Sequence, residues 1–287
     1  MPLPTLAGLC TYEDAAHIGY SVDDTVRLLV RYAWIEKRAM DTGRREGFDV
    51  VILDTAGRLQ IDDALMDQLV QLRERIGHAA LSGLSATIHA IGDKANHKAL
   101  NALSEARKLP QKDTLRHRIE HAQIPLPEDR KRFRELDVIA SMQPMHIVDD
   151  VRIADKYLGS RAANAYPVNA YLQEGVRVVF GSDMPVADPD PLKGMLAAVA
   201  RRYRLDPAEP VWYPEHCISP LQALVAYTRE AAFASYEETV KGTLEAGKLA
   251  DFVVLSGDVL QGGEDAFYTA EPVMTVLAGK CVYRSEV

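Results

Sequence analysis

Three polar residues stand at the ends of apolar runs in the sequence. His89 lies in IHAIGD, His121 in RIEHAQ and Asp183 in FGSDMPV. Two neutral imidazoles and one carboxylate can bind a divalent ion such as Zn²⁺ and leave one coordination position for water. Such an ion lowers the pKa of that water, and Asp183 could take up the released proton and return it to a leaving group. The chemistry indicated is therefore metal-assisted hydrolysis.

Each of these residues also has a structural interpretation. A single histidine at a strand end more often forms a hydrogen bond within the fold than binds a metal, whereas three such residues together favour a site. His146, in SMQPMHIVDD, is predicted to line the same rim or contact a substrate, and Tyr166 and Met184 are further candidates for such a contact. His117 precedes His121 by four residues, which is about 13 Å along a strand, so it is not expected to be a co-ligand.

The runs that carry these residues alternate with helical patterns from about residue 84 onward. Strands are predicted at 85–91, 115–121, 138–143 and 176–182, and helices at 94–107, 127–136, 191–202 and 220–235. This alternation predicts parallel βα units, in which the loops after the strands carry the chemistry. The last fifty residues contain the glycine-punctuated segments KGTLEAGKLADFVVL and VMTVLAGKCVYR, which predict a small antiparallel β layer.

The first 75 residues indicate a helix, a strand and a second helix. Apolar residues recur at helical spacing in residues 21–40, and FDVVILD (48–54) is a compact β-branched run. A helix opened by Asp62 or Asp63 then continues to about Ile76. The predicted organisation is a segment 1–75, a main unit 76–235 and a β portion 236–287.

Five ordered motifs carry a family resemblance over residues 76–287. They are IHAIGDKAN, LRHRIEHAQ, VIASMQPMH, VVFGSDMPVADPDPLKGM and KGTLEAGKLADFVVL. In this order they resemble the C-terminal half of the amidohydrolase superfamily, in the family 3 branch that includes N-substituted formamide deformylase. The resemblance implies a (β/α)₈ barrel joined to a small β-sandwich. It also implies His89 and His121 as metal ligands after strands five and six, and Asp183 as the metal-binding aspartate that moves the proton after strand eight.

The sequence departs from this family pattern at its N-terminal side. The family carries an H-x-H pair after the first barrel strand, and no H-x-H occurs in this sequence. A complete barrel takes about 250 residues, yet only some 75 residues precede the strand-five equivalent. The expected fold is therefore α/β, a partial or rearranged (β/α)₈ TIM-like barrel with a small C-terminal β layer. Its visible ligands are expected to hold one Zn²⁺ or other divalent ion at most.

The segment GFDVVILDTAGRLQIDDALMDQLVQLRE (47–74) carries a second resemblance. It is similar to the nucleotide-hydrolysis segment of the signal-recognition-particle family of GTPases, which implies a Mg²⁺ contact for Asp54 and a γ-phosphate contact for Gly57. The sequence has no G-x-x-x-x-G-K-[ST] loop and no T-K-x-D motif. A strand–loop–helix unit that lends one strand to the sheet is therefore favoured over GTP binding. The two resemblances meet at a junction near residue 75. Such a junction would arise from a natural fusion, an engineered chimera or an assembly artefact.

Bulk properties exclude several classes of partner. The 287 residues carry a net charge of −8 and no basic stripe, so nucleic acid and anionic membrane surfaces are not expected partners. Three scattered cysteines without a C-x-x-C pair fit a reducing compartment. No apolar run approaches the roughly 20 residues that span a bilayer. A cytoplasmic location is the default expectation.

The leading hypothesis is a metal-dependent amidohydrolase that hydrolyses the amide-type C–N bond of a small molecule, with activity weakened by the missing H-x-H ligands. One alternative is an inactive chimeric or truncated scaffold whose exposed sheet edges drive self-association, and a homo-oligomer is expected. The other alternative is a GTP-binding module based on Asp54 and Gly57.

Overall fold

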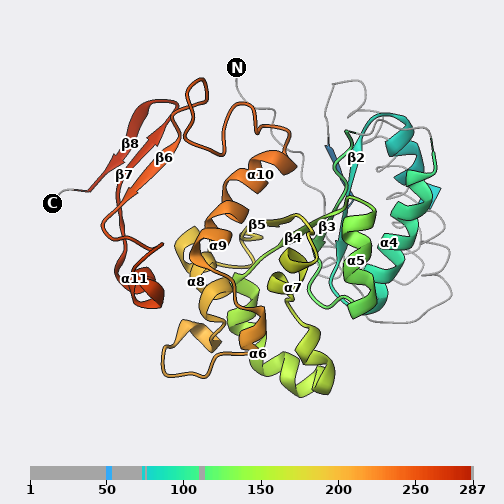
Figure 1. Ribbon diagram of the computed structural model, residues 1–287, viewed down its shortest axis with the longest axis horizontal. Helices are drawn as coiled ribbons and strands as arrows, with labels where there is room; N and C mark the ends of the chain where they lie inside the picture. Colours follow the sequence, from blue (N-terminus) through green and yellow to red (C-terminus); the bar gives the residue numbers. More distant parts are fainter. Residues whose placement is uncertain (1–49, 54–72, 75, 110–113, 286–287) are drawn as a thin grey trace, which may run out of the picture.

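A computed structural model of the chain describes residues 50–53, 73–74, 76–109 and 114–285. Its main sheet has five strands, in the order β1-β2-β3-β4-β5, and every neighbouring pair is parallel. The strands are β1 (Val50–Leu53), β2 (Ser85–Ala90), β3 (Arg118–His121), β4 (Ile139–Met142) and β5 (Val178–Phe180). The α/β class predicted from the sequence is confirmed, because strands alternate with helices and pair in chain order (Figure 1).

Helices connect the strands and continue after the last of them. They are α4 (Asp93–Arg107), α5 (Pro127–Glu135), α6 (Met145–Leu158), α7 (Val168–Gln173), α8 (Pro191–Ala200), α9 (Pro220–Tyr227) and α10 (Arg229–Ala234). Short 3₁₀ turns lie at η1 (Gly159–Asn164), η2 (Tyr203–Leu205) and η3 (Pro214–His216). Figure 1 shows α4 and α5 side by side next to β2 and β3. Parallel connections need crossovers of this kind, because both strands of a pair must run in the same direction.

The core lies between the sheet and these helices. Ile88 and Ile119 come from β2 and β3, Leu100 comes from α4 and Phe133 comes from α5, and all four are at most 1% exposed. The rings of Phe133 and Tyr171 meet edge to face, with centroids 5.0 Å apart. All residues of β4 and β5 are buried, which is typical of parallel strands covered on both faces.

The helix predicted at 220–235 is interrupted, and this prediction was wrong in that respect. Thr228 has φ −117° and ψ −84°, outside helical geometry, and separates α9 from α10. The hydroxyl of Thr228 donates to the carbonyl oxygen of Leu224 at 2.7 Å. Side-chain bonds of this kind to the preceding turn often bend helices.

The segment that resembles GTPases contributes a strand to the main sheet. β1 pairs in parallel with β2, with Val50 opposite Ser85 and Leu53 opposite Ile88. The prediction that this segment lends one strand to the sheet is therefore confirmed. The helix expected at 21–40 and the loop with Asp54 and Gly57 lie outside the described residues.

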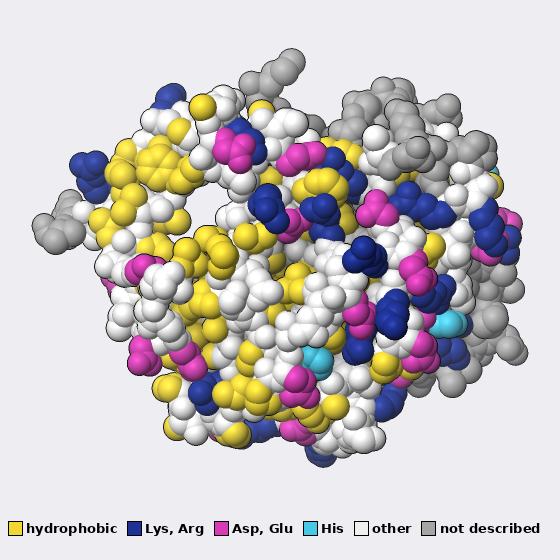
Figure 2. All heavy atoms as spheres, in the orientation of Figure 1, with side chains coloured by type: hydrophobic (Ala, Val, Ile, Leu, Met, Phe, Trp, Pro, Cys, Tyr) yellow, Lys and Arg dark blue, Asp and Glu magenta, His cyan; other side chains and the backbone are white. Residues whose placement is uncertain are grey.

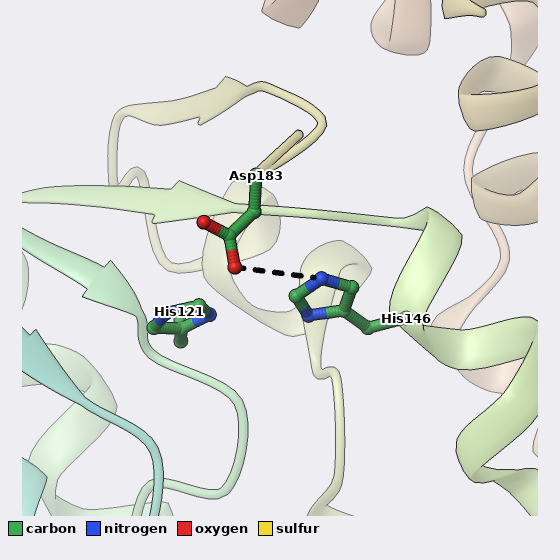
Figure 3. A group of neighbouring side chains, drawn as sticks. All are labelled: His121, His146 and Asp183. Carbon is green, nitrogen blue, oxygen red and sulfur yellow. Dashed lines mark ion pairs between the residues drawn. The ribbon is translucent and has the colours of Figure 1, made fainter. Parts of the chain in front are cut away.

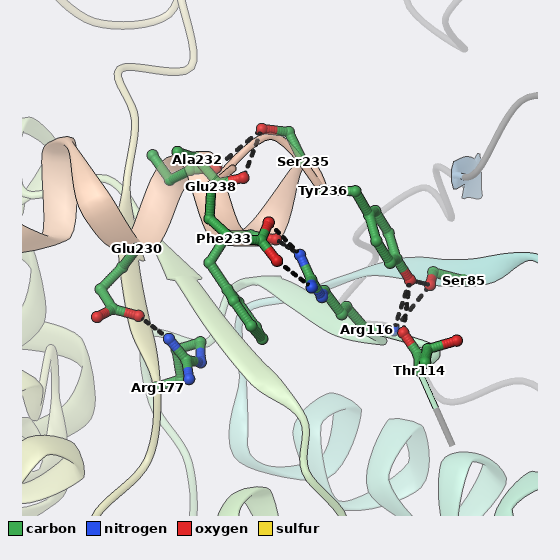
Figure 4. Close-up of polar contacts among 11 residues, drawn as sticks. Ser85, Thr114, Arg116, Arg177, Glu230, Ala232, Phe233, Ser235, Tyr236 and Glu238 are labelled. Atoms are coloured by element: carbon green, nitrogen blue, oxygen red, sulfur yellow. Dashed lines mark hydrogen bonds and ion pairs between the residues drawn. The ribbon is translucent and has the colours of Figure 1, made fainter. Parts of the chain in front are cut away.

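At the amino ends of the strands, α10 is held by a group of side chains that we call the amino-end clasp. It consists of Arg116, Arg177 and Phe233, with the guanidinium carbons of the two arginines 3.7 and 3.6 Å from the centroid of the Phe233 ring (Figure 4). Arg116 also forms an ion pair with Glu238 at 2.5 Å, and Arg177 forms one with Glu230. The clasp therefore joins the residues just before β3 and β5 to the end of the helical region.

The C-terminal residues form a small antiparallel sheet, as the glycine-punctuated segments predicted. Its strands are β6 (Phe252–Leu255), β7 (Pro272–Leu277) and β8 (Lys280–Arg284), and a helix that was not predicted, α11 (Gly263–Thr269), lies between β6 and β7. Glu264 of α11 pairs with Arg202 at 2.9 Å, which ties this layer to the region around η2. Hydrophobic side chains gather on its surface in Figure 2; the exposed ones include Val253, Val254, Leu277, Val282 and Tyr283.

No described helix combines the length and the apolar character that a membrane crossing requires.

Candidate active site

The candidate residues are placed by the carboxyl ends of the parallel strands. His121 is the last residue of β3, His89 lies one residue before the end of β2, and Asp183 follows β5 by three residues. His146 is the second residue of α6, just after β4. Because the strands are parallel, their carboxyl ends lie at the same edge of the sheet, so these four side chains are brought to one place.

Three of the four side chains converge closely. Ligand atoms of His121, His146 and Asp183 all lie within 4.8 Å of one another. Nε2 of His146 is 3.7 Å from Oδ2 of Asp183, and the rings of His121 and His146 are stacked with centroids 5.7 Å apart (Figure 3). The ring of His89 meets that of His121 edge to face, with centroids 4.4 Å apart. His89 is thus adjacent to the three-residue group but outside it.

The backbone at two of these positions is in the left-handed region. His121 has φ +71° and Asp183 has φ +58°. Non-glycine residues rarely adopt this region, and such conformations are found preferentially at functional sites. At His121 this conformation also ends the alternation of side chains between the two faces of the sheet. The register pairs His121 with Ala90, yet its ring reaches the ring of His89.

Burial keeps two imidazoles of the group neutral. The side chain of His121 is buried, and burial, followed by the neighbouring His89, lowers the pKa of His121 to about 4. Burial also lowers the pKa of His146. A neutral imidazole is the form that binds a metal ion. The Asp183 side chain is more open, with 40% of its surface exposed.

The donor set fits a divalent metal ion. Among the described residues, Nδ1 of His121 and Nε2 of His146 are buried side-chain atoms without a hydrogen-bond partner. Buried polar atoms without a partner in the chain are costly, so each calls for a partner from outside it. Imidazole nitrogen together with carboxylate oxygen is a ligand set that Zn²⁺ and related ions accept.

A chain of hydrogen bonds runs from His146 into the protein. Nε2 of Gln123 lies 3.3 Å from Nδ1 of His146 and donates to the hydroxyl of Tyr166 at 2.6 Å. The hydroxyl of Tyr166 donates in turn to Asp150. Burial, and next to it Asp150, raises the pKa of Tyr166 well above its usual value, so its hydroxyl stays a donor. Gln123 and Tyr166 are themselves buried.

The structure also places three further histidines. His117 is buried near the amino end of β3, where its Nδ1 accepts from the backbone N–H of Ala86 at 3.0 Å, so it lies away from the group, as predicted. His97 pairs with Asp129, and Nε2 of His216 lies 2.9 Å from the carbonyl oxygen of Ala163. Both therefore contact neighbouring groups of the fold.

Sequence reasoning missed Gln123 and Asp150. Two signals were available. Gln123 stands two residues after His121 in RIEHAQ, and Asp150 stands four residues after His146 on α6, where it shares the same helix face. The ligand roles expected for His89, His121 and Asp183, and the substrate contact expected for His146, remain predictions that the geometry allows.

The chain also has short matches to signal-recognition-particle proteins. The signal recognition particle protein of Bacillus subtilis (strain 168) is 52% identical over 40 residues, which are 14% of this chain and 9% of that protein. The similarity is therefore confined to a short part of both proteins.

Comparisons with known proteins agree over most of the chain. The chain is 38% identical over 208 residues to Protein LONG AFTER FAR-RED 3 of Arabidopsis thaliana, covering 70% of this chain and 34% of that protein. It is 30% identical over 183 residues to N-substituted formamide deformylase of Arthrobacter pascens, covering 63% of this chain and 33% of that protein. The chain thus spans about a third of the length of these relatives.

A solved structure gives the same result. An uncharacterized metal-dependent hydrolase from Pyrococcus furiosus is 32% identical, with a TM-score of 0.55, over 75% of this chain and 43% of that one. The model of the amidohydrolase family matches residues 13–283, which is most of the sequence. The resemblance drawn from the five ordered motifs is confirmed, and the chain belongs to the amidohydrolase family.

Proposed function

We propose that this chain is a metal-dependent amidohydrolase that hydrolyses an amide-type C–N bond of a small molecule. The observation that carries the proposal is the convergence of His121, His146 and Asp183 within 4.8 Å at the carboxyl ends of parallel strands. The family membership and the likeness to a metal-dependent hydrolase support it.

One Zn²⁺ or similar divalent ion would be held by His121, Asp183 and His89. His121 offers the buried Nδ1 and Asp183 a partly exposed carboxylate, and the ring of His89 lies against that of His121. Zinc suits this mixture of imidazole and carboxylate. The parallel sheet would be part of a (β/α)₈ barrel, in which such strand ends carry the chemistry.

The residues of the chain divide the reaction between them. A divalent ion, when bound, supplies Lewis-acid chemistry that makes a water molecule more acidic. Asp183 accepts one proton from this water as the water oxygen adds to the carbonyl carbon of the substrate. Asp183 then gives the proton to the leaving nitrogen as the C–N bond breaks, so the products are a carboxylic acid and an amine. His146, which lies beside Asp183, would contact the substrate.

Metal analysis of the purified full chain tests this function. We expect about one tightly bound zinc per chain after loading and removal of excess metal. His121→Ala and Asp183→Asn should lose the ion, whereas His97→Ala, which removes a histidine paired with Asp129, should keep it. Release of amine from a panel of N-substituted amides measures the hydrolysis itself. A chain that binds no divalent metal at micromolar concentration would refute the proposal.

A further inference from the structure

The hydrogen-bonded chain behind His146 determines which nitrogen of that imidazole carries the proton. At the far end of this chain, the carboxylate of Asp150 accepts a hydrogen bond. The hydroxyl of Tyr166 has one proton, and it donates that proton to Asp150. The oxygen of Tyr166 can then only accept from its other neighbour, which is the side-chain amide of Gln123.

This constraint fixes the orientation of the Gln123 amide. The atom that faces the Tyr166 oxygen at 2.6 Å must be the NH₂ group, because a carbonyl oxygen there would face another acceptor. The same nitrogen lies 3.3 Å from Nδ1 of His146. It therefore presents its second N–H to Nδ1, which must act as the acceptor. A neutral His146 then carries its proton on Nε2.

The members of this chain are held in place by the fold. Tyr166 has φ +53°, and its backbone N–H donates to the carbonyl oxygen of Gln123 at 2.6 Å. Its carbonyl oxygen accepts from Arg201 at 2.9 Å, and Arg201 is fully buried. Asp150 and His146 are four residues apart on α6 and share one face. Backbone bonds on both sides of Tyr166 thus maintain a rare conformation that aims its hydroxyl at both partners.

The protonated nitrogen faces the centre of the site. Nε2 of His146 is buried, has no hydrogen-bond partner among the described residues, and lies 3.7 Å from Oδ2 of Asp183, which is too long for a hydrogen bond. A nitrogen that carries a proton has no lone pair for a metal ion. It is instead a donor held ready for an acceptor that enters the site.

We infer that Asp150, Tyr166 and Gln123 are positioning residues that hold His146 in its Nε2–H form, so that His146 donates a hydrogen bond to the carbonyl oxygen of the substrate and does not bind the metal. This inference rests on the proposed amidohydrolase function for the identity of the acceptor. It divides the three converging residues into two ligands, His121 and Asp183, and one donor. Neutral donors aimed at an oxygen that gains negative charge stabilise the transition state of acyl transfer.

Nitrogen-15 NMR of the imidazole rings in the metal-free full chain tests the tautomer directly. In the parent we expect a pyrrole-type Nε2 and a pyridine-type Nδ1 at His146, assigned by the signals missing from His146→Gln. Gln123→Glu replaces the donor with an acceptor and should move a proton onto Nδ1. Tyr166→Phe removes only a hydroxyl and should allow both tautomers. Tyr171→Phe removes another buried hydroxyl, one that donates to the carbonyl oxygen of Ala122, and should leave the signals of His146 unchanged.

Zinc titration separates a donor from a ligand. His146→Gln keeps an N–H group near the position of Nε2, so its zinc affinity should remain within about tenfold of the parent. His121→Gln should lose more than about 100-fold, beyond the usual effect of a residue behind the ligands. If His146→Gln loses zinc as His121→Gln does, or if Nδ1 of His146 is protonated in the parent, the inference is wrong. The tautomer is measured without metal or substrate, so this result does not depend on whether the chain is a hydrolase. A failure of the proposed function can therefore be distinguished from a failure of this inference.

Discussion

At the scale of single residues, the fold holds histidines in an uncharged form by removing them from water. His121 and His117 show this at opposite ends of β3, since burial lowers the pKa of each to about 4. At His121 the neutral ring is available for a metal ion. At His117 the neutral ring accepts a hydrogen bond from the backbone of Ala86, so the same physical effect serves stability there.

The buried His117 should make the protein less stable in acid. An unfolded histidine titrates near about 6.5, above the folded pKa of about 4. Between these values the unfolded chain binds more protons than the folded chain, so the free energy of unfolding falls as the pH falls through this window. The loss from His117 is on the order of 3 kcal/mol by the lower end of the window.

Urea unfolding between pH 7 and pH 4 measures this loss. His117→Asn, whose side-chain oxygen can accept from the N–H of Ala86, should show a smaller fall than the parent. Equal falls in the two proteins would contradict the assignment.

The sequence indicated part of the site, and physical reasons explain the rest. His89, His121 and Asp183 could be selected because parallel strands bring their carboxyl ends together whatever the details of packing. The spacing of Gln123 and Asp150 from His121 and His146 marked them as neighbours of the site, but their role could not be predicted, because the contacts that give it pass through Tyr166, which lies 43 residues from Gln123. Such contacts depend on the path of the loops, which the residue pattern does not encode.

At the scale of elements, strands and helices were predicted where apolar residues recur with a clear period. The parallel strands were located to within a few residues because each is a short apolar run between helices. The break at Thr228 was missed, since the apolar pattern continues through it, while the side-chain hydrogen bond to Leu224 that accompanies the break leaves no mark on that pattern. Substitutions at helix ends and at packing contacts between helices therefore test the fold at this scale.

The start of α9 should depend on its capping box. The hydroxyl of Ser219 accepts from the backbone N–H of Gln222, and the side chain of Gln222 accepts from the N–H of Ser219. Ser219→Ala should lower the free energy of unfolding by about 1 kcal/mol. Ser219→Asp retains a capping oxygen and should lose much less. Chemical denaturation of the three proteins compares them, and equal stability of parent and Ser219→Ala would show that the cap contributes nothing.

The packing of α8 against α9 should require a glycine at position 194. A Cβ atom there would lie 1.9 Å from the hydroxyl oxygen of Tyr227 and 2.8 Å from its ring. Gly194→Ala should therefore destabilise the protein by about 1–3 kcal/mol. Adding Tyr227→Phe should restore part of the loss, because it removes the nearer atom. Gly257→Ala, where a Cβ would meet only an ordinary contact at 3.8 Å, serves as the control in thermal unfolding.

At the scale of the whole molecule, the amino-end clasp and the candidate site lie at opposite ends of the strands of the main sheet. The amino-end clasp lies before β3 and β5, whereas His121 and Asp183 lie at or after the carboxyl ends of the same strands. The C-terminal sheet forms a third region, joined to the helices through α11 and the pair of Arg202 with Glu264. The homo-oligomer expected from the sequence remains a prediction, which sedimentation can test.

A change in the clasp should weaken the fold without altering the metal site. Phe233→Leu keeps an apolar side chain but removes the ring that the two guanidinium groups contact. We expect the free energy of unfolding to fall by about 2 kcal/mol. Zinc affinity per folded chain should stay within about threefold of the parent, which corresponds to a change in binding free energy below about 1 kcal/mol. A large loss of zinc affinity would show that the two ends of the sheet are coupled.

The pairing of β1 with β2 has a wider consequence. Four residues from a stretch that resembles GTPases align in register beside β2, within the residues that the amidohydrolase family model matches. A parallel ladder matches backbone amides and carbonyls, which every extended segment presents at the same spacing. The pairing of β1 with β2 therefore requires only that both segments are extended and parallel, whatever other proteins each segment resembles.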